Sequence, residues 1–102
     1  MKTNEIVHLG GRIFMPASQV LFLQSEVNYT HIHFKNGEHA IVATTLKELE
    51  KRLSNYGFWR INKSVMVNLA QAKIQKVEGI VKLRNFQPMK ISRRRKAQIS
   101  AL

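Results

Sequence analysis

Short runs of strand-forming residues, separated by glycine, proline and asparagine, limit the folds open to this chain. The clearest pair covers residues 29–34 and 39–43, which lie on either side of an Asn-Gly dipeptide at 36–37. Asn-Gly is the strongest short signal for a β-hairpin with a two-residue loop. With that loop, Ile32 pairs with Ile41, and both are β-branched residues that suit a cross-strand pair. The sequence therefore predicts antiparallel strands.

Similar runs extend over most of the chain. Gly10 and Gly11 are predicted to connect the first two runs, because glycine adopts positive φ at little cost. Residues 20–24 (VLFLQ) are apolar on both faces, which predicts a strand that is covered on two sides. The other strand-like runs are residues 6–9, 12–15, 58–62, 64–67, 72–77, 80–84 and 89–91.

One helix is well signalled. Thr45 and Glu48 have the spacing of a capping box, in which the threonine side chain accepts a hydrogen bond from a free backbone N–H of the first turn. Leu46, Leu49 and Leu53 follow on a narrow apolar stripe. With 102 residues, the chain is predicted to be a single, mostly-β domain over residues 1–102.

Positive charge is concentrated in the second half of the chain. The sequence has 17 Lys and Arg against six Glu, and residues 51–102 hold thirteen of those cations but only one acid, Glu78. A formal charge of +11 makes a polyanion the first expected partner. The segment 93–102 is predicted to be either a short basic helix or a frayed tail.

Two residue types are missing, which excludes several classes of function. Without Asp or Cys, the chain has no Ser-His-Asp triad, no phospho-accepting Asp, no thiol nucleophile and no cysteine zinc site. We therefore predict no catalytic residues, no cofactor and no enzymatic activity. Residues 1–20 resemble neither a signal peptide nor a membrane span, so we expect a cytoplasmic protein that does not enter the membrane.

Three polar segments are candidates for nucleic-acid contact. Residues 92–96 hold the densest charge and suit either phosphate and guanine contacts or a solvated tail. Residues 59–64 interrupt two apolar strands and suit either a rigidly presented loop or an ordinary polar turn. In residues 26–30, Asn28 suits either an adenine contact or an Asx turn to its own backbone. Tyr29 suits base stacking, a phosphate contact or packing.

Three histidines raise the question of a metal site. His31 and His33 alternate onto one face of their predicted strand, whereas the expected hairpin register puts His39 on the opposite face. A third ligand is then missing, and no Asp is present to orient the others. We predict no metal site and assign these histidines a structural or surface role.

Taken in order, these segments resemble the LytTR family (LytR/AlgR type) of bacterial DNA-binding domains. The resemblance covers nearly the whole chain and rests on VLFLQS at 20–25, NYT at 28–30, KNGE at 35–38, TLKELE at 45–50, FWRINKS at 58–64, VN at 67–68 and ISRR at 91–94. It implies an elongated arrangement of small antiparallel sheets with one short helix near residues 45–54. It also implies that loop side chains read successive major grooves and bend the duplex.

The resemblance implies contact roles for individual residues. The contacting regions correspond to Asn28, Tyr29 and His31, to Asn62 and Lys63, and to the segment from Ser92. Lys63 and Arg94 match positions that reach bases or adjacent phosphates, while Arg60, Arg93 and Arg95 match phosphate contacts. The family commonly has His-Arg-Ser-Tyr where this chain has residues 62–65, so Lys63 lacks the arginine fork and recognition should differ there.

The implied partner is double-stranded DNA, bound during transcriptional regulation as the output of a two-component system. A second copy on direct-repeat sites and a receiver or sensor protein in trans are further implied partners. The start at Met1 favours a stand-alone domain over a fragment of a response regulator. The alternative is a small RNA-binding β-domain of the ribosome-associated type. It is disfavoured because five phenylalanines are expected in the core rather than on a stacking surface: Phe14, Phe22, Phe34, Phe58 and Phe86.

Overall fold

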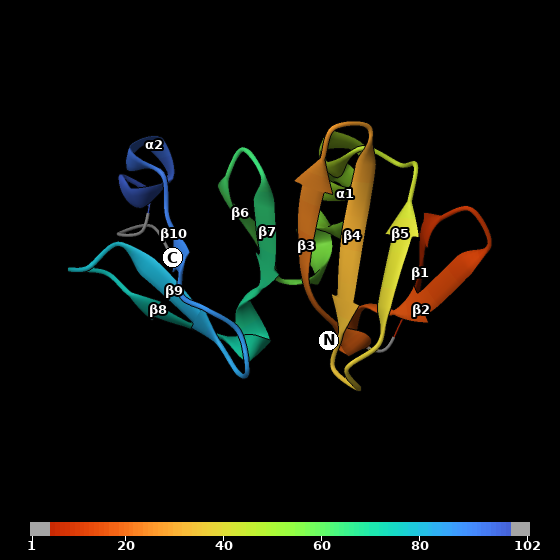
Figure 1. The fold of residues 1–102 in the computed structure, drawn as a ribbon, viewed down its shortest axis with the longest axis horizontal. Coiled ribbons are helices and arrows are strands. Elements are labelled where there is room, and N and C mark those ends of the chain that lie inside the picture. Colours follow the sequence, from red (N-terminus) through yellow and green to blue (C-terminus); the bar gives the residue numbers. More distant parts are fainter. Residues whose placement is uncertain (1–4, 99–102) are drawn as a thin grey trace.

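The computed structural model describes residues 5–98, which fold into short strands, two α-helices and single turns of 3₁₀-helix (Figure 1). The strands are β1 (Ile6–Gly10), β2 (Ile13–Pro16), β3 (Val20–Glu26), β4 (Tyr29–Phe34), β5 (His39–Val42), β6 (Phe58–Asn62), β7 (Val65–Asn68), β8 (Ala72–Gln75), β9 (Ile80–Leu83) and β10 (Met89–Lys90). The helices are α1 (Leu46–Leu53) and α2 (Arg93–Lys96). The basic segment 93–102 therefore begins as a short helix, and its last four residues lie outside the described residues.

The strands pair antiparallel in three small sheets. The central sheet has the order β5-β4-β3-β7-β6, the hairpin β1-β2 lies beside β5, and β10-β9-β8 forms the third sheet at the other end (Figure 1). The molecule measures 39 × 32 × 26 Å, and the sheets follow one another along its longest axis. The predicted mostly-β fold of small antiparallel sheets with one short helix is confirmed; α2 adds a single turn.

Two apolar clusters hold these sheets together, and β3 contributes to both. Val20 and Leu23 lie in the cluster that includes the leucines of α1, whereas Phe22 lies in the cluster shared with β9 and β7. Phe22 and Leu23 alternate onto opposite faces of the strand, and the register shift between Val20 and Phe22 places Val20 in the cluster of Leu23. The prediction of a strand covered on two sides is confirmed.

Helix α1 forms as its sequence predicts. Thr45 Oγ1 accepts a hydrogen bond from the backbone N–H of Glu48 at 3.2 Å, and the three leucines of the apolar stripe are buried. The Glu48 carboxylate does not return to the cap but pairs with Arg52 at 3.3 Å. The helix thus has the cap and the buried stripe but only half of the reciprocal capping box.

The hairpin β4–β5 has a different register from the predicted one. Ile32 pairs with Ala40, and His33 pairs with His39, so the expected pair of Ile32 with Ile41 is wrong. Only Gly37 of the Asn-Gly dipeptide has positive φ, at 90°, whereas a two-residue type I′ loop needs positive φ at both positions. Asn36 Oδ1 instead accepts a hydrogen bond from the Glu38 N–H at 2.9 Å. This side-chain turn lengthens the loop and moves His39 onto the face of His31 and His33.

The first hairpin also differs by one position. Gly10 belongs to β1 and pairs with Ile13, so the connection is Gly11 and Arg12 rather than the two glycines. A Cβ at residue 10 would lie 2.4 Å from Thr44 Oγ1, so glycine is needed there for close packing against the chain that follows β5.

The expectation that all five phenylalanines are in the core is wrong for two of them. Phe14 is 58% exposed and Phe86 is 37% exposed, whereas the other three are buried. Phe14 alternates outward on the two-stranded sheet, where it stacks on His8 with ring centres 4.5 Å apart. A two-stranded hairpin has one face without a partner sheet, so an apolar residue there stays exposed.

Candidate nucleic-acid interface

The three polar segments lie at one edge of the molecule. The turn between β3 and β4, the turn between β6 and β7, and helix α2 are at the same end of the sheets, along the top of Figure 1. Backbone hydrogen bonds join them: the Ser25 N–H donates to the Ser64 carbonyl at 2.8 Å, and the Ser92 N–H donates to the Ile61 carbonyl at 2.9 Å. We call residues 26–29, 62–64 and 92–95 the loop edge.

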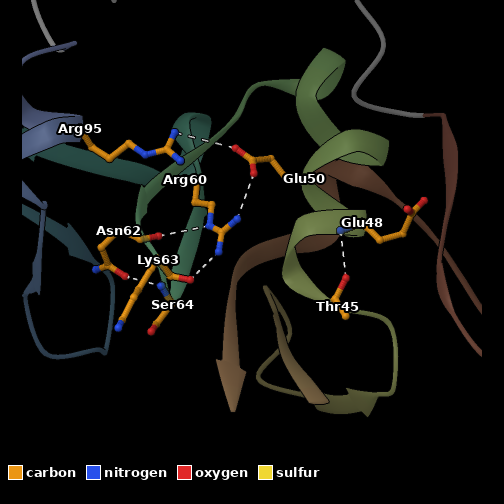
Figure 2. Close-up of polar contacts among 8 residues, drawn as sticks. All are labelled: Thr45, Glu48, Glu50, Arg60, Asn62, Lys63, Ser64 and Arg95. Carbon is orange, nitrogen blue, oxygen red and sulfur yellow. Dashed lines mark hydrogen bonds and ion pairs between the residues drawn. The ribbon is translucent and has the colours of Figure 1, made fainter. Parts of the chain in front are cut away.

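Arg60 holds the β6–β7 turn from within (Figure 2). Its Nε donates to the Asn62 carbonyl at 3.3 Å, and its Nη2 donates to the Lys63 carbonyl. Its Nη1 bonds Glu50 Oε1 of helix α1 at 3.1 Å, and its side chain is only 17% exposed. Because each guanidinium nitrogen has a partner in the chain, Arg60 braces the turn rather than presenting a free fork.

The Asn62 side chain also forms hydrogen bonds within the chain. Its Oδ1 accepts a hydrogen bond from the Ser64 N–H at 2.8 Å, and its Nδ2 donates to the Lys90 carbonyl at 2.8 Å. The amide therefore shapes the turn and ties it to β10. Lys63, at the tip, makes no side-chain hydrogen bond or ion pair within residues 5–98, and it is exposed. The turn is built to present the Lys63 ammonium.

Helix α2 presents its arginines beside that turn. Ser92 caps the helix, since its Oγ accepts a hydrogen bond from the Arg95 N–H at 3.2 Å. Arg95 points back toward α1 and lies 3.9 Å from Glu50 Oε2, whereas Arg93 and Arg94 are exposed. An open crevice of about 570 Å³ separates the helix from the turn; it is lined by Arg60, Asn62, Lys63, Ser92, Arg94 and Arg95.

Glu50 was not among the residues singled out from the sequence. Its carboxylate binds Arg60 and approaches Arg95, so it is the acid of helix α1 that joins two basic segments of the loop edge (Figure 2). Nothing local in the sequence identifies it, because its partners lie 10 and 45 positions further along the chain. Only the packing of α1 beside β6 brings these groups together.

The β3–β4 turn presents three side chains in succession. Val27 is 93% exposed and has a φ of 51°, and Tyr29 is 54% exposed. Asn28 is exposed, and its side chain makes no hydrogen bond within the described residues, so the expected Asx turn is not observed there. All three side chains project from the tip without a partner in this part of the chain.

His31 lies on β4, two residues after Tyr29, in a cluster of three histidine rings. Its Nε2 lies 2.6 Å from Glu26 Oε1, and its Nδ1 lies 2.8 Å from His39 Nε2. His39 stacks on both His31 and His33, with ring centres 4.9 and 4.7 Å apart. Burial, and then the charges of His39 and His31, lower the pKa of His33 below its usual value.

This stack corrects the prediction that His39 lies on the opposite face. The three rings share one face because of the shifted hairpin register. Three of their nitrogens already have partners, because His31 Nδ1 and His39 Nε2 share a hydrogen bond and His31 Nε2 is bonded to Glu26. Within residues 5–98, no group of three His, Cys, Asp or Glu side chains is placed to hold a metal ion.

Comparison with known families identifies the chain. The family described as the LytTr DNA-binding domain matches residues 10–102. This chain belongs to the LytTR family. LytTR proteins are DNA-binding domains of transcription regulation rather than a family of enzymes, which agrees with a basic edge built from three segments.

A solved structure has the same fold as this LytTR chain. It is the "LytTr DNA-binding domain of putative methyl-accepting/DNA response regulator from Bacillus cereus". The likeness has a TM-score of 0.69 and 20% identity, and it covers 99% of this chain and 94% of that one. A search of curated proteins gives no match. Within the described residues, no helix is long and apolar enough to cross a membrane.

Proposed function

We propose that this LytTR domain binds double-stranded DNA sequence-specifically, with the loop edge facing the duplex. The observation that carries the proposal is the convergence of three separate segments on one edge, where Lys63 and Arg94 are exposed beside a shared crevice. Lysine and arginine are the side chains that most often reach guanine O6 and N7 in the major groove. In this proposal Lys63 and Arg94 reach bases, and Arg93 contacts phosphate.

The order of the segments along the molecule supports contact with more than one groove. The loop edge follows the longest axis, which measures 39 Å, but it ends at the β3–β4 turn, short of β5 and the β1–β2 hairpin (Figure 1). Successive major grooves on one side of straight B-DNA are roughly 34 Å apart, so contact with two of them requires the bent duplex that the family resemblance implies. The β3–β4 turn and helix α2 lie toward opposite ends of this edge, so we assign them to neighbouring grooves, with the β6–β7 turn between them.

The contacts inside the chain refine the expected roles of four residues. Arg60 and Asn62 donate hydrogen bonds to groups of the chain itself, Arg95 forms an ion pair with Glu50 at 3.9 Å, and His31 is held by Glu26. We propose that Arg60 and Asn62 position the β6–β7 turn, that Arg95 contributes positive charge behind the edge, and that His31 supports the β3–β4 turn through Glu26. Contacts to the bases are then made by the exposed side chains that have no partner within residues 5–98.

Selection of bound sequences from a random duplex pool tests this function. We expect one motif to be enriched, with affinity at least roughly 10³-fold above that for a scrambled duplex. Single-stranded RNA of the same length serves as competitor, because an RNA-binding β-domain would prefer unpaired bases. Failure to enrich any duplex, or preferential displacement by the RNA, would overturn the proposal.

The partners of this domain follow from the same proposal. The chain has no Asp and so carries no phospho-acceptor of the aspartyl type. We propose that a receiver or sensor protein controls it in trans, that two copies occupy direct-repeat sites, and that it acts on the bacterial chromosome in the cytoplasm. Gel-shift steps of one and two protomers on a duplex with one and two motifs test the second point.

A further inference from the structure

The turn between β3 and β4 holds a valine in a backbone conformation that valine disfavours. Val27 has a φ of 51°, in the left-handed region where a β-branched side chain crowds its own backbone. Glycine, asparagine and aspartate are the residues that adopt this conformation readily. A valine at this position therefore destabilises the turn relative to the usual residues.

Nothing within the described chain offsets that cost. The Val27 side chain is 93% exposed, so its methyl groups bury almost no apolar surface in the free protein. Residues held in disfavoured conformations concentrate at sites of function, where a partner makes use of them. The exposed apolar group is therefore expected to contact something outside the chain.

The position of Val27 indicates what that partner is. Glu26 pairs with Tyr29, so Val27 and Asn28 form the tip of a two-stranded antiparallel ribbon. Such a ribbon fits the major groove of B-DNA. The neighbouring turn is tied to it through the bond from Ser25 N–H to the Ser64 carbonyl, so Val27 lies on the same edge as Lys63.

We propose that Val27 is a specificity-determining residue whose methyl groups contact the C5-methyl of a thymine. This inference rests on the proposed function and adds a contact to it. The thymine methyl is the apolar group on the floor of the major groove, and small apolar side chains are its usual partners. Phosphates and the other base edges offer hydrogen-bonding groups, which an isopropyl group cannot use.

Asn28 strengthens the preference of this turn. Its amide is exposed and makes no side-chain hydrogen bond within residues 5–98. An asparagine amide bonds adenine N6 and N7 with two hydrogen bonds. Adjacent Val27 and Asn28 thus both favour A·T pairs, so the base pairs under the β3–β4 turn are expected to be A·T.

A double-mutant cycle across the interface tests the thymine contact. The enriched duplex is prepared with deoxyuridine in place of each thymine in turn, which removes only the methyl group. We expect one replacement to weaken binding by the wild-type domain about fourfold, the effect of one lost methyl contact. In Val27→Gly the same replacement should have no effect, because the partner methyls are gone.

Val77→Gly is the matched control. Val77 is also exposed, at 88%, but it lies in the turn between β8 and β9, outside the loop edge. This variant should keep the fourfold loss at the same thymine. Thermal melts of both variants show whether the fold is intact.

The possible results distinguish a failure of the thymine contact from a failure of the proposed DNA-binding function. If no duplex is enriched by the wild-type domain, the proposed function fails and the inference fails with it. If a duplex is enriched but no thymine shows a loss that depends on Val27, the domain reads DNA and the thymine contact is wrong. A loss that Val77→Gly also abolishes overturns the assignment to Val27.

Discussion

At the scale of single residues, the loop edge contains two kinds of side chain: those that form hydrogen bonds within the chain, and those that form none within residues 5–98. The side-chain N–H groups of Arg60 and Asn62 donate hydrogen bonds to backbone carbonyls. Lys63, Arg93 and Arg94 are exposed, and no side-chain bond forms for them within residues 5–98. Only the second group is free to discriminate between bases without first breaking contacts of the fold.

Arg94→Ala tests base reading by a free arginine. We expect it to reduce discrimination at one base pair of the motif by about 1–3 kcal/mol, because a bidentate contact to guanine is lost. Arg93→Ala, one position earlier in the same helix, is the control and should weaken all duplexes alike. Competition assays with single-base variants of the motif measure both effects. Equal losses on the motif and on random duplex for Arg94→Ala would contradict the assignment.

Val27→Gly should stabilise the free domain. Glycine removes a left-handed penalty of about 1–2 kcal/mol for a residue with a Cβ, while its greater freedom in the unfolded chain costs about 0.5–1 kcal/mol. The net expectation is a gain of about 0.5–1 kcal/mol in the free energy of unfolding, measured by urea titration. A loss of stability would show that the valine makes a favourable contact in the free domain.

At the scale of elements, helix α1 and the hairpin β4–β5 show what local sequence can predict. The cap by Thr45 and the buried leucine stripe follow from neighbours within one or two turns, so they were predictable. The hairpin register was not, because a single Asn36 side-chain bond to Glu38 N–H competes with the two-residue loop. The internal partners of Arg60 and Asn62 depend on residues far along the chain, so the sequence did not separate positioning from contact.

Arg60→Ala tests whether the brace between α1 and the β6–β7 turn is structural. The variant leaves two backbone carbonyls and the Glu50 carboxylate without their donor, so the free energy of unfolding should fall by about 1–3 kcal/mol. Affinity for the motif should fall while the salt dependence of binding stays the same. Arg93→Ala, a proposed phosphate contact, should instead reduce the slope of log K against log salt by about one. A similar reduction for Arg60→Ala would make Arg60 a phosphate contact.

The histidine stack on β4 and β5 predicts how stability depends on pH. The pKa of His33 is lowered from 6.5 by burial and by the charges of His39 and His31, while Glu26 bonds His31 rather than His33. The folded protein thus binds this proton more weakly than the unfolded chain does. The free energy of unfolding should therefore fall as the pH decreases through 6.5 toward the pKa of folded His33, and then level off.

Urea unfolding at several pH values between neutral and mildly acidic conditions measures this dependence. His33→Phe keeps a ring against Phe22, with which His33 stacks at 4.2 Å, but it cannot be protonated. The variant should show a shallower loss of stability over the same range. The control His8→Gln, which changes a histidine outside the stack, should retain the wild-type dependence. An unchanged pH profile in His33→Phe would exclude His33 as the source.

At the scale of the whole molecule, charge is distributed unevenly between the two halves of the chain. Residues 51–102 supply β6–β10 and α2, and they hold thirteen of the 17 cations. Five of the six acids belong to residues 1–50, and two of them, Glu48 and Glu50, lie on α1. The fold thus places two of the three segments of the loop edge in a strongly basic half, which favours approach to a polyanion in one orientation.

Salt dependence tests whether this charge is used for binding. If about six phosphates are neutralised, log K should fall by roughly five per tenfold rise in salt, because condensed counterions are released from the duplex. Fluorescence anisotropy between roughly 50 and 200 mM salt gives the slope. The slopes measured for the motif duplex and for a scrambled duplex should be similar, since phosphate contacts do not depend on sequence. A slope near zero would mean that the basic half does not face the duplex, and the orientation of the loop edge would then be wrong.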